Sequence, residues 1–208
     1  MITTTLKKIR RCRPCGLERG SKIVYNILRK NLGKNYRDNT PVKFSQIIES
    51  NNLGDAIWCL QSVCPENEKE VRLFATDCAE HVLHIFEAKI PNDDRPRKAI
   101  QAARDFAEGK ITKEAARDCS LDAYAAFWAC FDALYNHAAR SAEDAALAAY
   151  EASWNSLDND GSIISDAAWS AAFSAWWASA EAGWAAGLSY VLDYEEEFQI
   201  NLLTKNFS

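Results

Sequence analysis

The sequence lacks the residue patterns on which the common classes of enzyme depend. It has three histidines, and it contains no glycine-rich phosphate loop, no nucleophile elbow and no metal-binding helix motif. Its single Cys-x-x-Cys pair, Cys12 and Cys15, could complete a zinc site only with His81 and His84, because no second pair exists. We therefore expect no catalytic residues, no cofactor and no metal, and a protein that acts by binding.

Basic residues are absent from a long C-terminal stretch. Ser141 to Thr204 contains no Lys or Arg but eleven carboxylates, whereas residues 1–43 contain six Lys and six Arg against one Glu and one Asp. Charge fields of one sign steer partners of the opposite sign. Either the basic start folds over the acidic part and neutralises it, or the chain has two binding surfaces, one suited to nucleic acid and one to a basic protein.

The N-terminus lacks the apolar segment of a secretory signal peptide, and the seven cysteines are odd in number. We therefore expect reduced thiols and a cytoplasmic location. The one stretch that resembles a membrane span, Ala167–Leu192, is interrupted by Glu181 and is built mostly of weakly apolar residues. We expect no association with a membrane.

Alanine and tryptophan are abundant instead. Between Ala99 and Gly187 there are 29 alanines and six of the seven tryptophans. Alanine favours helices and lets them approach closely, while tryptophan at helical spacing supplies large apolar area. The predicted fold class is all-α, a multi-helix bundle with long Ala/Trp-rich helices in the C-terminal half. We expect a central helix whose aromatic row lies in the core: Trp169, Phe173, Trp176, Trp177 and Trp184.

Periodicity and stop signals predict the other helices. The expected ranges are Leu6–Arg10, Ser21–Leu32, Phe44–Glu49, Leu53–Val63 and Glu66–Lys89. Asp93 to Pro96 should start the next helix, which ends near Gly109, and aromatic rows in 124–135 and 147–157 mark two more. No strand is predicted. The expected organisation is a basic N-terminal helical arm, 1–43, and an all-helical domain, 44–208, with which the arm can form a single domain.

Two charged clusters are candidate binding sites. The first has five residues at an expected helix N-terminus: Asp93, Asp94, Arg95, Arg97 and Lys98. Its cations and the free backbone N–H groups could bind an anion such as a nucleotide phosphate. Alternatively, the aspartates cap their own helix and the cations pair with acidic neighbours such as Glu80 and Glu87.

The second cluster ends the acidic stretch and consists of Glu195, Glu196 and Glu197. Three adjacent carboxylates without a cation nearby in the sequence repel one another, and a basic partner would relieve that repulsion. We expect this cluster to contact a basic protein in a salt-sensitive complex.

Three phrases carry a resemblance to a known family. They are Leu53–Leu60 (LGDAIWCL), Val71–Glu87 (VRLFATDCAEHVLHIFE) and Asp93–Arg104 (DDRPRKAIQAAR). Together with the start at Leu6–Cys15, they resemble the immunity-protein-five-like group of bacteria and their phages. The resemblance implies a non-catalytic protein that neutralises a toxin, or a phage protein that acts against a host defence effector. The alternative from the residues is a nucleotide- or nucleic-acid-binding protein, and either class can form oligomers.

Overall fold

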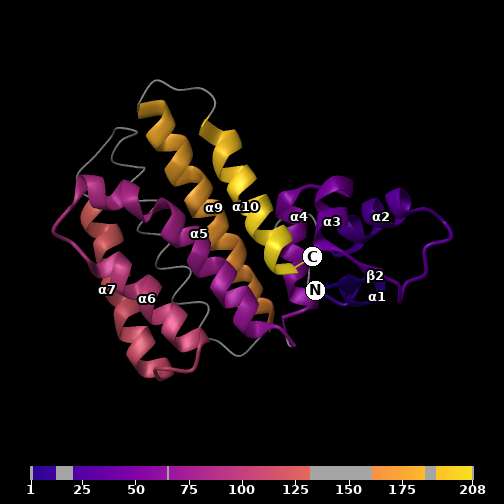
Figure 1. The fold of residues 1–208 in the computed structure, drawn as a ribbon, viewed down its shortest axis with the longest axis horizontal. Coiled ribbons are helices and arrows are strands. Elements are labelled where there is room, and N and C mark those ends of the chain that lie inside the picture. The colour runs from indigo at the N-terminus through magenta and orange to yellow at the C-terminus, as the bar shows by residue number, and fades with distance from the viewer. Residues whose placement is uncertain (1, 13–20, 65, 132–160, 186–190, 208) are drawn as a thin grey trace.

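The computed structural model describes residues 2–12, 21–64, 66–131, 161–185 and 191–207. Within these residues it is 76% helical with almost no strand, which confirms the predicted all-α class (Figure 1). The aromatic row predicted in 147–157 lies outside the described residues. None of the described helices is both long and apolar enough to cross a membrane.

The elements follow one another in two groups along the chain. The first group contains β1 (Thr4–Thr5), α1 (Leu6–Ile9), α2 (Ser21–Leu32), β2 (Pro41–Val42), α3 (Phe44–Ser50), α4 (Leu53–Trp58) and the 3₁₀ helix η1 (Cys59–Ser62). The second contains α5 (Glu68–Lys89), α6 (Arg95–Ala107), α7 (Lys113–Phe131), α9 (Gly161–Ala185) and α10 (Val191–Phe207). The two short strands pair antiparallel, and this pairing was not predicted.

Local side-chain chemistry sets several of these boundaries. The Asn52 side chain accepts a hydrogen bond from the backbone N–H of Asp55 at 2.7 Å and so starts α4. Gly109 ends the α6 region with a φ of +73°, a left-handed conformation that glycine adopts without strain. Thr112 then accepts the backbone N–H of Ala115 at 3.3 Å and caps α7.

The helices are arranged around α5 and α9. Helix α5 packs on α9 and on α6, α7 packs on α6, and α10 packs on α9 (Figure 1). The last turn of α10 reaches the first group of elements, where the Phe207 ring lies 5.5 Å from Phe44 of α3 between centroids, and the same ring lies 6.3 Å from Phe74 of α5. The predicted central position of α9 is confirmed.

The prediction that the rings of α9 lie in the core is wrong for Phe173, which is 46% exposed. Trp169, Trp176 and Trp177 are half-buried, and the side chain of Trp184 lies outside the described part. The buried residues of α9 are mostly small, among them Ala168, Ala171, Ala172, Ala175 and Ala178, and Glu181 is a large buried side chain beside them. Because alanines of α9 pack against α5, where Ala75 and Ala79 are also buried, the two backbones lie too close for large rings to fit between them.

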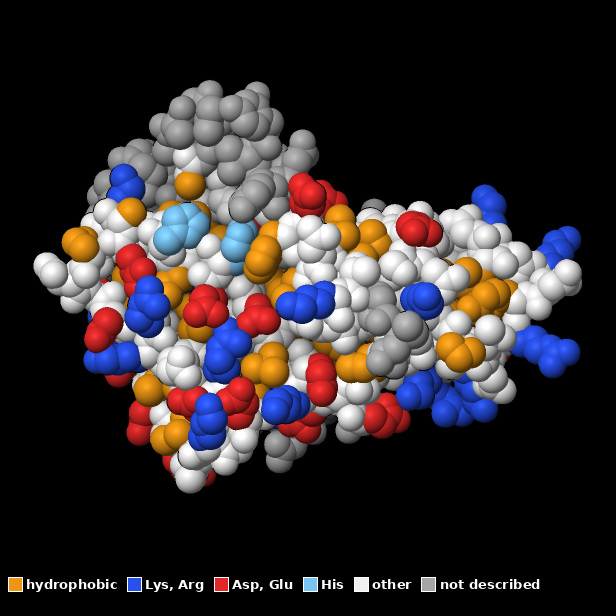
Figure 2. Space-filling model, viewed as in Figure 1, with side chains coloured by type: hydrophobic (Ala, Val, Ile, Leu, Met, Phe, Trp, Pro, Cys, Tyr) orange, Lys and Arg blue, Asp and Glu red, His pale blue; other side chains and the backbone are white. Residues whose placement is uncertain are grey.

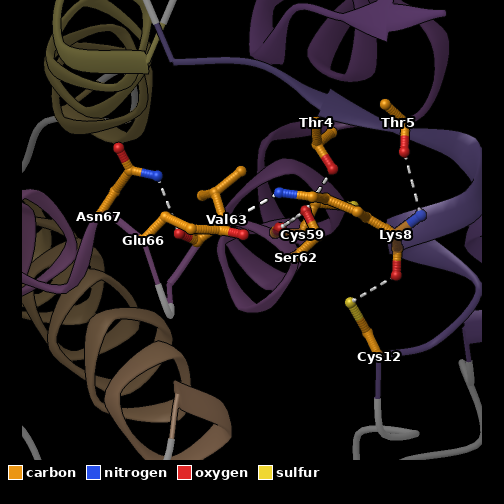
Figure 3. A network of polar contacts seen from close by, with 9 residues as sticks. All are labelled: Thr4, Thr5, Lys8, Cys12, Cys59, Ser62, Val63, Glu66 and Asn67. Carbon is orange, nitrogen blue, oxygen red and sulfur yellow. Dashed lines mark hydrogen bonds and ion pairs between the residues drawn. The ribbon is translucent and has the colours of Figure 1, made fainter. Parts of the chain in front are cut away.

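The N-terminal region joins the same hydrophobic core. Leu6, Ile9, Val24 and Leu28 are all buried in the cluster that also contains Phe207. A polar network fixes this contact in Figure 3, where the Thr4 hydroxyl lies 2.5 Å from the Ser62 hydroxyl of η1. In the same network the Lys8 ammonium donates to Glu66 at 3.0 Å, and the Ser62 hydroxyl donates to the Cys59 carbonyl at 2.6 Å (Figure 3).

Candidate functional site

A groove of about 270 Å³ lies between α4, α9 and α10. Its lining is mostly apolar. Asn52, Leu53, Gly54 and Ile57 come from α4 and the turn before it, Trp169, Ala172, Phe173 and Trp176 come from α9, and Glu196 and Gln199 come from α10. We call this feature the aromatic groove. Among the described residues, the only charged one in its lining is Glu196.

The α9 wall of the aromatic groove is a row of three rings. Trp169, Phe173 and Trp176 are spaced by four and three residues, so they lie on one face of the helix. The Trp169 and Phe173 planes are 11° apart with centroids at 5.0 Å, and the Phe173 and Trp176 planes are 13° apart at 6.5 Å. The row therefore presents aromatic surface at an open site, on a different face of α9 from most of the buried alanines, while Ala172 itself lines the groove.

The α4 wall is shaped by the start of that helix. Gly54 sits where a Cβ atom would lie 3.3 Å from Asn52 Oδ1 and 4.0 Å from the indole nitrogen of Trp169. A contact of 3.3 Å is already tight, so a larger residue here would press on the cap that starts α4. The glycine thus keeps the rim beside Trp169 open.

The α10 wall supplies the polar groups of the aromatic groove. Glu196 is exposed, and within the part of the chain that the structure describes its carboxylate has no ion pair. Gln199 is buried, and its amide nitrogen donates to the Ala172 carbonyl at 2.8 Å and to Glu195 Oε1 at 2.9 Å. Both amide N–H groups are thereby used, so the group that Gln199 can offer a ligand is its carbonyl oxygen, an acceptor.

The predicted acidic cluster needs a correction at Glu195. This side chain is fully buried, with Oε2 at 2.6 Å from His81 Nδ1 and 3.5 Å from the Ser179 hydroxyl. Phe198 stacks on the His81 ring at 3.6 Å between centroids. Consecutive helical residues point about 100° apart, so Glu195 turns inward while Glu196 and Glu197 remain exposed. Glu195 therefore holds α10 on α5 and cannot contact a partner.

The residues of the other predicted cluster pair among themselves and with Glu87. Arg95 contacts Asp93 through two bonds of 2.8 and 2.5 Å, and Lys98 contacts Asp94 at 3.0 Å. Arg97 contacts both carboxylate oxygens of Glu87 at 2.7 Å. The hydrogen bond from Arg95 lowers the pKa of Asp93 below its ordinary value. An anion at this position would have to displace three carboxylates.

Each aspartate of this cluster has a different local role. Asp93 accepts the backbone N–H of Arg95 at 3.1 Å, as the capping alternative predicted. Asp94 precedes α6 but makes no capping bond with its side chain. Glu80 binds Arg104 at 2.6 Å, so it does not pair with the cations at 95, 97 and 98 as had been expected.

The described cations of the basic N-terminal region form no ion pair with the exposed glutamates of α10. The ion pairs of its described residues join Lys8 to Glu66, and Arg10 and Arg29 to Asp38. Six other cations are exposed without an ion pair to any described residue: Lys7, Arg11, Lys30, Lys34, Arg37 and Lys43. Figure 2 shows Lys and Arg side chains gathered at the end formed by α2, with acidic side chains few there. We call this end the basic end.

Sequence reasoning missed the aromatic groove because it assigned the α9 rings to the core. The signal was present, since the alanines at 168, 171, 172, 175 and 178 form one face and the rings at 169, 173 and 176 form another. When a helix carries its small residues on one face and its large residues on another, a closely approaching neighbour can pack only against the small face.

The comparisons with known proteins bear on a part of the chain that contains none of the residues lining the aromatic groove. Residues 62–154 match the model of the family described as Imm-5 like putative immunity protein. The resemblance seen in the sequence is confirmed over these residues, which include the phrases at 71–87 and 93–104. The match supports an immunity-protein role and a protein partner. No curated protein and no solved structure matches the chain.

Proposed function

We propose that this protein is a non-catalytic immunity protein that neutralises a toxin or a host defence effector by stoichiometric binding at the aromatic groove. The observation that carries the proposal is Phe173, a large ring 46% exposed at the centre of a concave apolar site. The family match over 62–154 supports the class of function. The groove supplies a place where a protein partner would bind.

Protein interfaces obtain most of their affinity from a few side chains that fill pockets and lose water. Aromatic anchors are enriched among these residues, and the surrounding contacts mainly exclude water. In the aromatic groove, Trp169, Phe173 and Trp176 are already held in a row by α9, so binding costs little side-chain order. The site is therefore organised before a partner arrives.

Charge favours a basic partner at this site. Glu196 lines the aromatic groove, Glu197 follows it on α10, and both are exposed. Complementary rim charges raise the rate of association and make it sensitive to salt. The partner surface we propose thus combines an apolar centre with an acidic rim.

The decisive experiment is neutralisation of the toxin or effector encoded beside this gene. Phe173→Ala should abolish protection and complex formation on size-exclusion chromatography while leaving the helical circular dichroism unchanged. Leu121→Ala is the matched control, because Leu121 is 48% exposed on α7, outside the groove. Full protection by Phe173→Ala would reject the groove as the contact, and release of a processed product from the target would reject the stoichiometric mechanism.

Nucleotide or nucleic-acid binding is a second candidate, favoured by the exposed cations of the basic end. Phosphate contacts by Lys and Arg make binding weaken steeply with salt. A fluorescent single-stranded 20-mer should then bind at 50 mM salt, and the double variant Lys30→Glu/Lys34→Glu should bind it more weakly. Absence of binding at low salt, measured by anisotropy, would reject this candidate. The Arg95, Arg97 and Lys98 cluster would contribute only after its ion pairs open.

A further inference from the structure

We propose that the aromatic groove is a receptor for one arginine side chain of the partner protein, with the guanidinium against the ring row and beside Glu196. The proposal rests on the proposed function, since it names the chemistry of the group that the groove takes.

The elements around the groove are almost free of cations. Helices α4, α9 and α10 together carry seven carboxylates and a single Lys, Lys205, in the last turn of α10. Glu196 is the charged group that faces the groove itself. An anionic group entering here would meet a repulsive field, whereas a cation would be attracted before contact and paired after it. The field thus selects for a positively charged side chain.

The ring row selects among cations for a planar one. A cation near an aromatic ring is attracted by the negative face of its π-system, most strongly at tryptophan. The two tryptophans and Phe173 have nearly parallel planes, within 11° and 13° of each other. A flat guanidinium can stack along such surface, whereas the compact ammonium of lysine keeps its water more tightly. The row therefore fits arginine better than lysine.

The polar groups of the α10 wall complement the same side chain. Arginine carries five N–H donors and no acceptor. Glu196 offers a carboxylate, and Gln199 offers its carbonyl oxygen because Ala172 and Glu195 already accept its N–H groups. Buried Glu195 fixes Gln199 in this orientation through the 2.9 Å bond. Two acceptors from α10 thus stand on the wall of the groove, whose other polar lining residue among the described ones is Asn52.

The size of the groove suits one side chain. At about 270 Å³ it lies just below the range of about 300–1,000 Å³ that is usual for sites of drug-sized ligands. A single anchor residue of a larger interface is the occupant that this volume accommodates. The rest of the contact would then lie on the rim, which includes exposed Glu197 nearby on α10.

The test uses N-acetyl-L-arginine amide as the probe and the full chain as the receptor. Indole N–H signals in NMR spectra report on Trp169 and Trp176, once Trp169→Phe and Trp176→Phe have assigned them. The neutral control is N-acetyl-L-citrulline amide, which has nearly the same shape without the charge. We expect saturable shifts of both indole signals with the arginine probe, and binding about fivefold weaker with the citrulline probe.

A Glu→Gln change inside the groove and one outside it localise the effect. Glu196→Gln should weaken binding of the arginine probe about fivefold, while Glu49→Gln, which changes an exposed carboxylate on α3 outside both the groove lining and the proposed rim, should leave it unchanged. Equal binding of the two probes would overturn the proposal, as would an unchanged affinity in Glu196→Gln. Equal binding of N-acetyl-L-lysine amide would overturn the assignment to arginine.

The outcomes separate this inference from the proposed function. If the arginine probe fails to bind while Phe173→Ala still abolishes neutralisation, the groove contacts the partner through another anchor and the inference is overturned alone. If the arginine probe binds in the groove but Phe173→Ala protects fully, the proposed function at this site is rejected instead. Concentration-dependent displacement of the probe by a second copy of the chain would assign the arginine to self-association and overturn the partner assignment.

Discussion

Removal of the Glu195 carboxylate tests the most consequential difference between the sequence interpretation and the structure. The side chain is fully buried, and it accepts from His81 at 2.6 Å and from Gln199 at 2.9 Å. In Glu195→Ala, the Gln199 amide loses one acceptor inside the protein, and His81 loses the charge with which it is paired. Neighbouring Glu197 is exposed on the same helix and provides a matched Glu→Ala control.

The size of the expected loss in stability follows from the hydrogen bonds that are removed. Leaving a buried donor without its acceptor costs about 1–3 kcal/mol, and more where the acceptor was charged. Two donors lose Glu195 in this variant, His81 Nδ1 and the Gln199 amide, but the His81 side chain keeps 21% exposure and can regain some water, so we expect about 3 kcal/mol in total. For a chain of this size, 1 kcal/mol corresponds to about 2–4 °C, which predicts a fall in Tm of about 6–12 °C. Glu197→Ala should change the free energy of unfolding by less than about 0.5 kcal/mol.

Urea unfolding followed by circular dichroism at 222 nm measures both variants against the parent chain. The reasoning is refuted if Glu195→Ala lies within about 1 kcal/mol of the parent, or if Glu197→Ala costs as much. The result also decides how the acidic cluster is to be probed. Reversal of all three glutamates to Lys would place a cation in the core, so lost neutralisation would report unfolding, and only Glu196 and Glu197 are suitable for reversal.

Three further outcomes follow from burial and ion pairing. Burial raises the pKa of the Cys59 and Cys78 thiols well above their ordinary 9.0, so both should react with DTNB at pH 8 only after unfolding by guanidinium. Asp93→Asn should cost about 1 kcal/mol at pH 7, and because Arg95 lowers the pKa of Asp93 below 3.8, urea titrations should show this difference shrinking as pH falls below 3.8. Ala175→Leu should destabilise by about 1–3 kcal/mol through overpacking against α5, while Ala125→Leu at an exposed site should be neutral.

Helix positions were predictable because their signals are local. Helix α2 has the predicted bounds, Ser21–Leu32, since Gly33 at a φ of +89° ends it. The predicted helix Leu53–Val63 is instead divided into α4 and η1. The Ser62 hydroxyl bonds to the Cys59 carbonyl and to Thr4, so a side chain competes for the backbone there. The Thr4 contact spans 58 residues, and no local pattern contains it.

The candidate site was less predictable, for two physical reasons. A run of three glutamates covers about 200° of a helix, so once α10 packs on α5 and α9 at least one must turn inward, but which one depends on the partners across the interface. His81 lies 114 residues from Glu195 in the sequence, so only the packing of α10 on α5 brings the two side chains together. The contacts of Asp93 are with Arg95, two residues along the chain, so the sequence could predict that this aspartate caps its own helix.

The aromatic groove follows from the alanine composition rather than from a special motif. Alanines at 171, 172 and 175 are buried, and with them α9 approaches α5 closely. That approach leaves no space for rings at the interface, so Trp169, Phe173 and Trp176 are placed toward α4 and α10, where Gly54 keeps the rim open. The alanine face of α9 therefore stabilises the fold, and the ring face of the same helix is the one we propose for recognition. Substitutions at Phe173 can therefore alter what the protein binds at little cost in folding, whereas substitutions at Ala175 cannot.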